Sequence, residues 1–218
     1  MSLEETPPPS AALRAALASM GPVRTRRPGL TLVLLLLSSL AWAGVGLLAS
    51  RLRPDFHAMS PAWLASLASI WMVAFVAPFW WLVMPPRSAV LPAVHRAVVP
   101  MIVGGLLLAA LLAAALFGWP MGVILPAERV VVGAAACFAI GSVVAVAPLV
   151  LAAFALRKVL PVGAGRAGAI CGAAAGALGA VMLELHCPAG GLHPLVAHGA
   201  CVLAGSALGA TLFRLLGR

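Results

Sequence analysis

Residues 130–156 read VVVGAAACFAIGSVVAVAPLVLAAFAL, and this apolar run without a charged side chain indicates the fold class. A stretch of about 20 apolar residues crosses the hydrocarbon core of a bilayer as an α-helix. Six such blocks follow one another along the chain, at approximately 30–49, 62–84, 98–117, 130–156, 167–185 and 194–213. The sequence therefore predicts an all-α integral membrane bundle of six transmembrane helices.

The composition of the whole chain favours a membrane protein over a soluble one. Of the 218 residues, 63% are hydrophobic and 9% are charged, whereas soluble domains carry about 25% charged residues. The formal net charge is +9, but the basic residues lie between the apolar blocks, where they orient a membrane protein and do not indicate direct nucleic-acid binding. Phosphate-loop, dinucleotide-binding, zinc-protease and serine-hydrolase motifs are absent from the sequence, so we do not expect an enzyme.

The distribution of Lys and Arg predicts the orientation of the bundle. With the N-terminus inside, the inner segments hold 11 of the 14 basic residues and the outer connectors hold 3. Because positive residues accumulate on the cytoplasmic side, we expect a multi-pass protein of the bacterial inner membrane with both termini in the cytoplasm. Its predicted parts are a cytoplasmic N-terminal segment, residues 1–29, and a transmembrane domain, residues 30–218.

The N-terminal segment contains the pattern of a short amphipathic helix. Leu13, Leu17 and Met20 recur at helical spacing on one face of residues 11–20. A helix of this length is marginal in water, so it needs either the membrane surface or a groove on a protein partner. Three arginines precede the first apolar block and suit anionic lipid, namely Arg24, Arg26 and Arg27.

Small residues recur every fourth position in the fifth apolar block. Gly168, Gly172 and Gly176 form a face that lets another helix approach closely. The sixth block repeats this pattern with Gly205 and Gly209. The pattern favours tight packing within the bundle, and an oligomer formed through the Gly168/Gly172/Gly176 face is the alternative.

The predicted topology gathers cysteines and histidines on the outer side, around the turn between the fifth and sixth blocks. These candidate signal-sensing residues are Cys137, His186, Cys187, His193, His198 and Cys201. A helix rises 1.5 Å per residue, which places Cys137 and Cys201 at similar depth. It also places Cys171 about 24 Å from Cys187 toward the cytoplasm, outside this group.

Three interpretations of the outer group stay open. The side chains can be ordinary buried thiols and interfacial histidines. Cys187 can form a redox pair with Cys137 or Cys201, because the outer compartment is oxidising. A soft metal ion can bind there, with Cys187, His186 and His193 as candidate ligands. Apart from this metal ion, we expect no cofactor.

Four features, taken in chain order, suggest a family. They are Leu13-xxx-Leu17 followed by Pro22-Val23 and arginines, Leu52-Arg53-Pro54-Asp55 after the first block, Cys137 in the fourth, and Leu185-His186-Cys187-Pro188 after the Gly/Ala-rich fifth. With them the chain resembles the NrsF-type membrane anti-sigma factors of bacteria. These are six-span proteins that hold an extracytoplasmic-function sigma factor at the inner membrane and release it under stress.

The resemblance implies roles for particular residues. Residues 1–29 would bind the sigma factor, with the leucines and Met20 as apolar anchors and the three arginines as steering charges. Cys137 and Cys187 would take part in signal sensing. The chain departs from the family in its turn after Pro188, which is Ala-Gly-Gly-Leu-His instead of acidic, and in the additional Cys171 and Cys201. The signal therefore stays open between redox, metal and light or oxidant stress.

Two other function classes are compatible with the residues. A small metal-ion or solute transporter or channel would use Glu184 and His198, which lie within reach of a pathway across the bundle. A haem- or metal-binding membrane protein would use outer histidines as ligands, chosen from His57, His186, His193 and His198. The partners expected for the anti-sigma interpretation are the sigma factor and membrane lipid.

Overall fold

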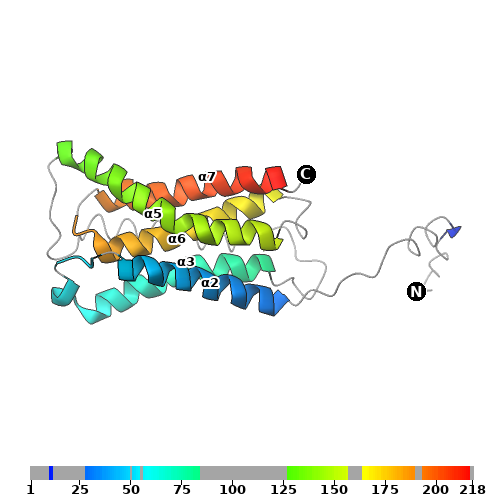
Figure 1. Cartoon of the computed structure of the whole chain (residues 1–218), viewed down its shortest axis with the longest axis horizontal. Helices are drawn as coiled ribbons and strands as arrows, with labels where there is room; N and C mark the ends of the chain where they lie inside the picture. Colours follow the sequence, from blue (N-terminus) through cyan, green and yellow to red (C-terminus); the bar gives the residue numbers. More distant parts are fainter. Residues whose placement is uncertain are drawn as a thin grey trace, which may run out of the picture.

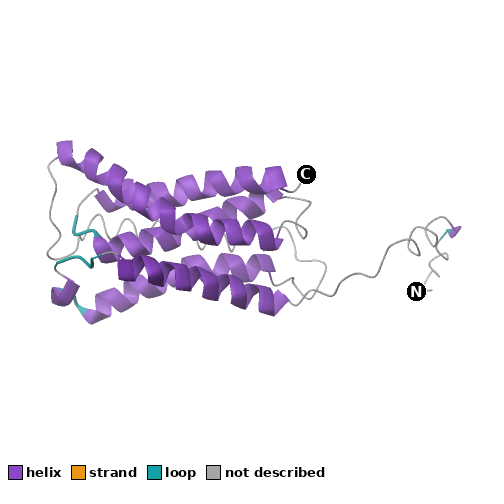
Figure 2. Cartoon of the chain, in the orientation of Figure 1, coloured by secondary structure: helices purple, strands orange, loops and turns teal. Residues whose placement is uncertain are grey.

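The computed structural model of the chain describes residues 10–11, 28–49, 51–54, 56–83, 127–156, 164–189 and 193–216. Five long helices make up most of this part: α2 (Pro28–Ala49), α3 (Pro61–Val83), α5 (Ala127–Leu156), α6 (Ala164–His186) and α7 (Gly199–Leu216). A short 3-10 helix, η1 (Phe56–Ala58), precedes α3, and a π-helical turn, η2 (Pro194–His198), precedes α7. The described residues contain helices and loops but no strand, which confirms the all-α prediction (Figure 2).

The five helices lie side by side along the long axis of one bundle (Figure 1). Successive helices of the pairs α2–α3 and α6–α7 run in opposite directions, so that α2 begins at the end of the bundle where α7 finishes. Helix α6 is central, because it contacts each of the other four long helices. A movement of α6 would therefore affect several neighbouring helices.

Four helices are long and apolar enough to cross a membrane. They are Gly29–Ala49, Gly133–Leu156, Ala164–His186 and Pro194–Leu216. The described structure thus supports four spans and not the six predicted. The predicted second block is helical as α3 but is not among these four, and the third block, 98–117, lies outside the described residues.

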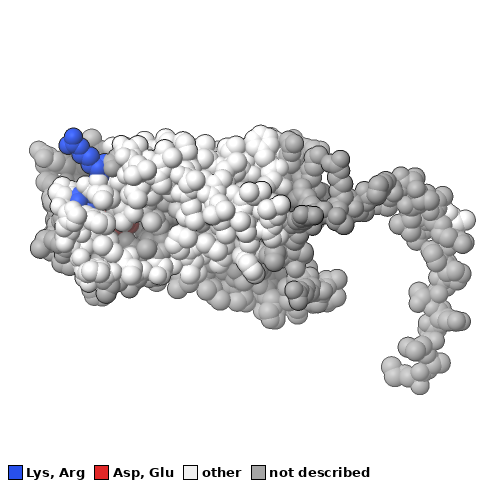
Figure 3. Space-filling view, turned by 60° about the horizontal axis from the view of Figure 1, so that its bottom comes forward, with Lys and Arg blue, Asp and Glu red and all other residues white. Residues whose placement is uncertain are grey.

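The outer surface of the bundle has the character of a lipid-facing surface. On α2, Leu34, Leu37 and Leu48 are all more than half exposed. In the space-filling view, the basic side chains in sight lie at one end, and the middle of this face carries none among the described residues (Figure 3). An apolar belt of this kind is what a helix bundle in a bilayer needs, because lipid cannot solvate charges.

Helices α6 and α7 meet along a seam of glycines. The facing pairs are Gly168 with Gly209, Gly172 with Gly205, and Gly176 with Cys201. A Cβ atom added to Gly172 would collide with the carbonyl oxygen of Gly205, so only glycine allows this approach. The seam confirms packing within the bundle. It also covers the face considered for an oligomer, which lies against α7 of the same chain.

The apolar core lies beside this seam and toward the cytoplasmic end predicted from the sequence. Phe75, Phe79, Leu149 and Phe213 are buried there together with Cys171. Of the predicted N-terminal helix, the structure describes only its first residue, Ala11. The sigma-binding candidates therefore lie outside the described residues, namely Leu13, Leu17, Met20, Arg24, Arg26 and Arg27.

Candidate sensor site

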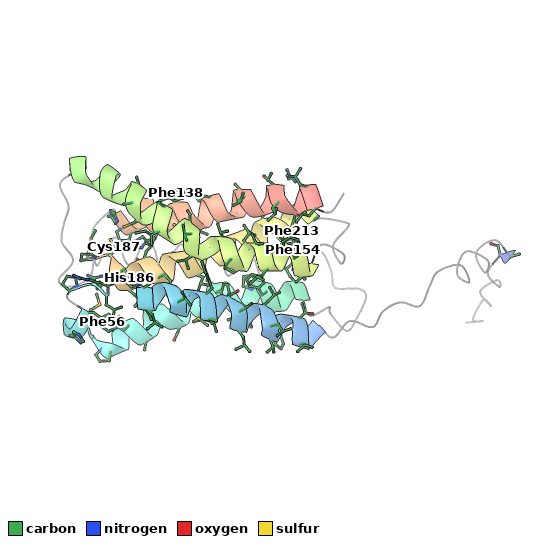
Figure 4. All side chains as sticks on the ribbon, viewed as in Figure 1. Phe56, Phe138, Phe154, His186, Cys187 and Phe213 are labelled. Carbon is green, nitrogen blue, oxygen red and sulfur yellow. The ribbon has the colours of Figure 1, made fainter. Side chains whose placement is uncertain are left out.

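Three side chains meet at the end of the bundle opposite the start of α2. Cys137 comes from α5, Cys187 follows the last residue of α6, and His193 immediately precedes η2. Figure 4 labels Cys187 and His186 at this end, beside Phe56 of η1, and Phe154 and Phe213 at the other. We call the group of Cys137, Cys187 and His193 the sensor cluster.

The reactive atoms of the sensor cluster are all within contact distance. The thiol sulfurs of Cys137 and Cys187 are 3.5 Å apart. Nε2 of His193 lies 3.3 Å from the Cys187 sulfur and 3.4 Å from the Cys137 sulfur. Both cysteines are free thiols. Of the two redox partners predicted for Cys187, the structure selects Cys137.

The environment of Cys187 favours its thiolate. The hydrogen bond from the Cys137 thiol contributes most to lowering the pKa of Cys187. The nearby His198 and the backbone of Ala189 act in the same direction, whereas burial opposes them. Because a thiolate is both the nucleophile and the metal ligand of cysteine, Cys187 is the more reactive member of the pair.

A buried acid and a buried histidine form a pair directly behind the sensor cluster. Nδ1 of His198 donates a hydrogen bond of 2.6 Å to Oε1 of Glu184, and each side chain is 1% exposed. An ionisable group inside an apolar bundle is costly unless it is paired. The pair therefore explains why the bundle tolerates Glu184 in α6.

The two histidines of the turn approach each other through η2. His193 and His198 have ring centroids 6.0 Å apart and perpendicular planes. The π-turn is closed by the amide of Gly199, which donates to the carbonyl oxygen of Pro194 five residues earlier. Each ring has one buried nitrogen without a hydrogen-bond partner among the described residues, Nδ1 of His193 and Nε2 of His198.

His186 does not belong to the sensor cluster, although it was a predicted metal ligand. Its Nδ1 donates a hydrogen bond of 2.7 Å to the carbonyl oxygen of Arg51. Beside it, the amide of Arg53 donates to the carbonyl oxygen of Leu185 over 3.1 Å. These two bonds, which we call the loop clasp, fasten the loop after α2 to the end of α6. The group that could hold a metal ion contains Cys137 and not His186.

The remaining cysteines lie apart from the sensor cluster. Cys201 is buried at the seam, and its thiol donates to the carbonyl oxygen of Ala197 at 3.4 Å. It also contacts the carbonyl oxygen of Phe138 on α5, at 3.8 Å. Cys171 is buried in the apolar core, in agreement with the prediction that it cannot join the outer group.

The sensor cluster offers two chemistries. Its two sulfurs and one imidazole nitrogen lie within 4.8 Å of one another, so the three can bind one metal ion. The same two thiols can be oxidised to a disulfide, which would draw α5 toward the end of α6. Sequence reasoning missed the Glu184–His198 pair and the loop clasp. An acid alone in an apolar helix was the available signal for the pair.

The family of the chain follows from comparison with known proteins. No curated protein and no solved structure matches the chain. The family described as negative regulator of sigma F matches residues 17–218, which is nearly the whole chain. This chain therefore belongs to the NrsF family of negative regulators of a sigma factor.

Proposed function

We propose that the protein is a membrane-bound anti-sigma factor that holds an extracytoplasmic-function sigma factor at the bacterial inner membrane. In this proposal residues 1–29 bind the sigma factor, and a stress signal acting on the sensor cluster releases it. Family membership supports the regulatory role and disfavours the transporter and haem-protein alternatives. The predicted transport carboxylate, Glu184, also has a structural partner in His198.

The observation that carries the proposal is the separation of the sensor cluster from the start of α2. Cys187 lies at one end of the bundle, whereas α2 begins at the other (Figure 4). The residues before α2 are the predicted sigma-binding segment. A signal at the outer end and a partner at the inner end are the arrangement that transmembrane regulation requires.

The loop clasp supplies a physical route between the two ends. Leu185 and His186 bond to the loop that follows α2, and the next residue is Cys187. Metal binding or oxidation at Cys187 would displace these two bonds and with them the end of α2. A packed helix moves as a rigid element, so the displacement would reach the N-terminal segment.

The helix directions are compatible with the proposed six spans and cytoplasmic termini. Helix α3 ends where α2 begins, and α5 begins at the opposite end of the bundle (Figure 1). A six-span count needs one crossing between them, where the apolar block 98–117 lies in the sequence. The distribution of Lys and Arg supports the orientation.

Co-purification tests the binding step. The tagged full-length protein and a variant lacking residues 1–22 are solubilised from native membranes, and mass spectrometry identifies the proteins bound to each. Arg24, Arg26 and Arg27 remain in both, which preserves insertion. We expect a sigma factor with the full-length protein and none with the variant. Its absence from both, with insertion verified, would contradict the proposal.

A reporter assay tests the sensing step. In cells with a reporter gene under the captured sigma factor, a variant carrying Cys137→Ser and Cys187→Ser should fail to respond to inducing stress. Cys201→Ala is the matched control, since this thiol donates to the backbone carbonyl of Ala197 and is not part of the sensor cluster. A normal response of the double variant would show that the signal is sensed elsewhere.

A further inference from the structure

We propose that Cys137, Cys187, His193 and His198 form a four-coordinate site for a divalent ion of the Zn²⁺ class, with Glu184 holding His198 from the outer sphere. The inference deepens the sensing step, and its regulatory meaning rests on the proposed function. Its structural basis is independent of that function and consists of donor spacing, burial and hydrogen bonding at the end of α6.

The spacing of the sensor cluster matches the edges of a tetrahedron around one ion. With Zn–S about 2.3 Å and Zn–N about 2.05 Å, tetrahedral ligands are about 3.8 Å apart for two sulfurs and about 3.6 Å apart for sulfur and nitrogen. The observed distances are 3.5 Å, 3.3 Å and 3.4 Å. A flat three-coordinate site would need about 4.0 Å and about 3.8 Å for the same bonds. The closer match is to the geometry that has a fourth ligand.

His198 is the side chain placed to supply the fourth ligand. Its Nδ1 is occupied by Glu184, which leaves Nε2 as the free ring nitrogen. That atom is buried and has no hydrogen-bond partner among the described residues. The ring lies edge-on to His193, with 6.0 Å between the ring centroids. Its nitrogens are not among the donors that lie within 4.8 Å of one another, so the ring must move toward the sensor cluster to complete the set. A buried imidazole nitrogen without a partner is costly, and coordination would satisfy it.

Glu184 gives His198 the form that a ligand needs. A carboxylate that accepts from Nδ1 keeps the proton there and leaves the lone pair on Nε2, the arrangement found behind many metal-bound histidines. The hydrogen bond is short, 2.6 Å, and both side chains are buried. Glu184 lies three residues before Cys187, whose amide donates to the carbonyl oxygen of Leu183 in the last turn of α6. The outer-sphere group and a ligand are thus both held by the end of one helix.

Charge and donor type identify the class of ion. Two thiolates and one divalent ion have no net charge together, which limits the cost of burial at the edge of a bilayer. A tetrahedral set of two sulfurs and two nitrogens is typical of Zn²⁺. A monovalent soft ion would leave one negative charge and commonly needs fewer ligands.

Zinc binding to the purified full-length protein tests the site. The probe is Zn²⁺ added to metal-stripped protein, with bound metal counted by mass spectrometry and affinity measured against a chromophoric chelator. We expect one Zn²⁺ per chain. X-ray absorption at the zinc edge should give two sulfur and two imidazole ligands. A spectrum with two sulfurs, one imidazole and an oxygen would overturn the role of His198. This measurement uses the wild-type protein alone.

Variants then separate the ligands from their neighbours. Cys187→Ser, His193→Ala and His198→Gln should each weaken Zn²⁺ binding by about 100-fold or more, and Glu184→Gln by about 10-fold. The matched controls are His186→Ala and Cys201→Ala, which remove a histidine and a cysteine near the site and should leave the affinity unchanged. Wild-type affinity in folded His198→Gln would contradict the assignment.

The same preparations distinguish this inference from the proposed function. If the wild-type protein binds no Zn²⁺ but still carries the sigma factor, the four-ligand site is wrong and the anti-sigma function stands. If it binds Zn²⁺ through two sulfurs and two imidazoles but carries no sigma factor from native membranes, the site stands and the anti-sigma function fails.

Discussion

Helix α6 takes part in two contacts of opposite chemistry. Along its middle, Gly168, Gly172 and Gly176 press backbone against backbone on α7. At its end, Glu184 and Cys187 face histidines through polar side chains. The three glycines have no side chain that can change its charge or bonding, whereas the end of the helix has several such groups. The middle of α6 thus stabilises the bundle, and its end carries the groups that can respond to a signal.

Gly172→Leu should have the largest effect, because it breaks the seam. A side chain at this position meets the backbone of Gly205, which cannot move aside as a side chain can. We expect the free energy of unfolding to fall by about 3 kcal/mol or more. Fluorescence-detected size-exclusion chromatography would show this as aggregation. Gly44→Leu on α2 is the control, since a Cβ there has no neighbour within 4 Å. Equal behaviour of the two variants would show that the seam does not stabilise the bundle.

Glu184→Ala should come next, because it leaves His198 buried without its acceptor. Removing one member of a buried polar pair costs about 3 kcal/mol, which thermal denaturation in detergent would detect as a lower Tm. Glu184→Gln can still accept the hydrogen bond and should lose less than half as much. If both variants denature like the wild type, the pair does not stabilise the end of α6.

His186→Ala should have a smaller effect, because it removes one bond of the loop clasp. The net value of such a hydrogen bond is about 1 kcal/mol, and the amide of Arg53 still bonds to Leu185. Tm should therefore fall slightly while reporter induction is clearly reduced. A variant with unchanged induction would show that the signal does not pass through the clasp.

Alkylation of the cysteines compares the end of α6 with the seam and requires no substitution. The lowered pKa of Cys187 keeps its thiolate populated below the usual thiol pKa of about 8.5. At pH 6 iodoacetamide should therefore modify Cys187 roughly tenfold faster than Cys201, which lies buried at the seam. Peptide mass spectrometry gives both rates. Equal rates, or a rate at Cys187 that falls steeply between pH 8 and pH 6, would contradict the lowered pKa.

The sequence was sufficient to predict most helix positions but not the partners at the site. Apolar length alone places α2 at 30–49, within two residues of the observed Pro28–Ala49. Rise per residue also separates Cys171 from the outer group. It cannot tell whether Cys137 or Cys201 faces Cys187, since both lie at similar depth. That choice depends on the rotation of α5 and α7 about their axes, which packing sets.

The structure places His186 outside the group that could hold a metal ion, for a related reason. Adjacency to Cys187 suggested a shared site, but the last turn of α6 directs His186 to Arg51. The chain then returns, so that His193 meets both thiols. The position of His193 depends on contacts between segments that are distant in the sequence. The pattern of apolar residues that predicts the helices contains no information on such contacts.

The π-helical turn has a consequence for how the chain tolerates changes in length. In an α-helix, residues five apart point about 140° away from each other, whereas the wider π-turn brings them nearer to the same side. The turn thus brings His193 and His198 to one side while α7 still presents Gly205 and Gly209 to α6. Deleting one residue of Pro194–His198 would force a choice between aligned imidazoles and aligned glycines. The extra residue of the turn changes the rotation of the chain between the imidazoles and the glycines. Natural variants should therefore conserve the length of the turn more strictly than its composition.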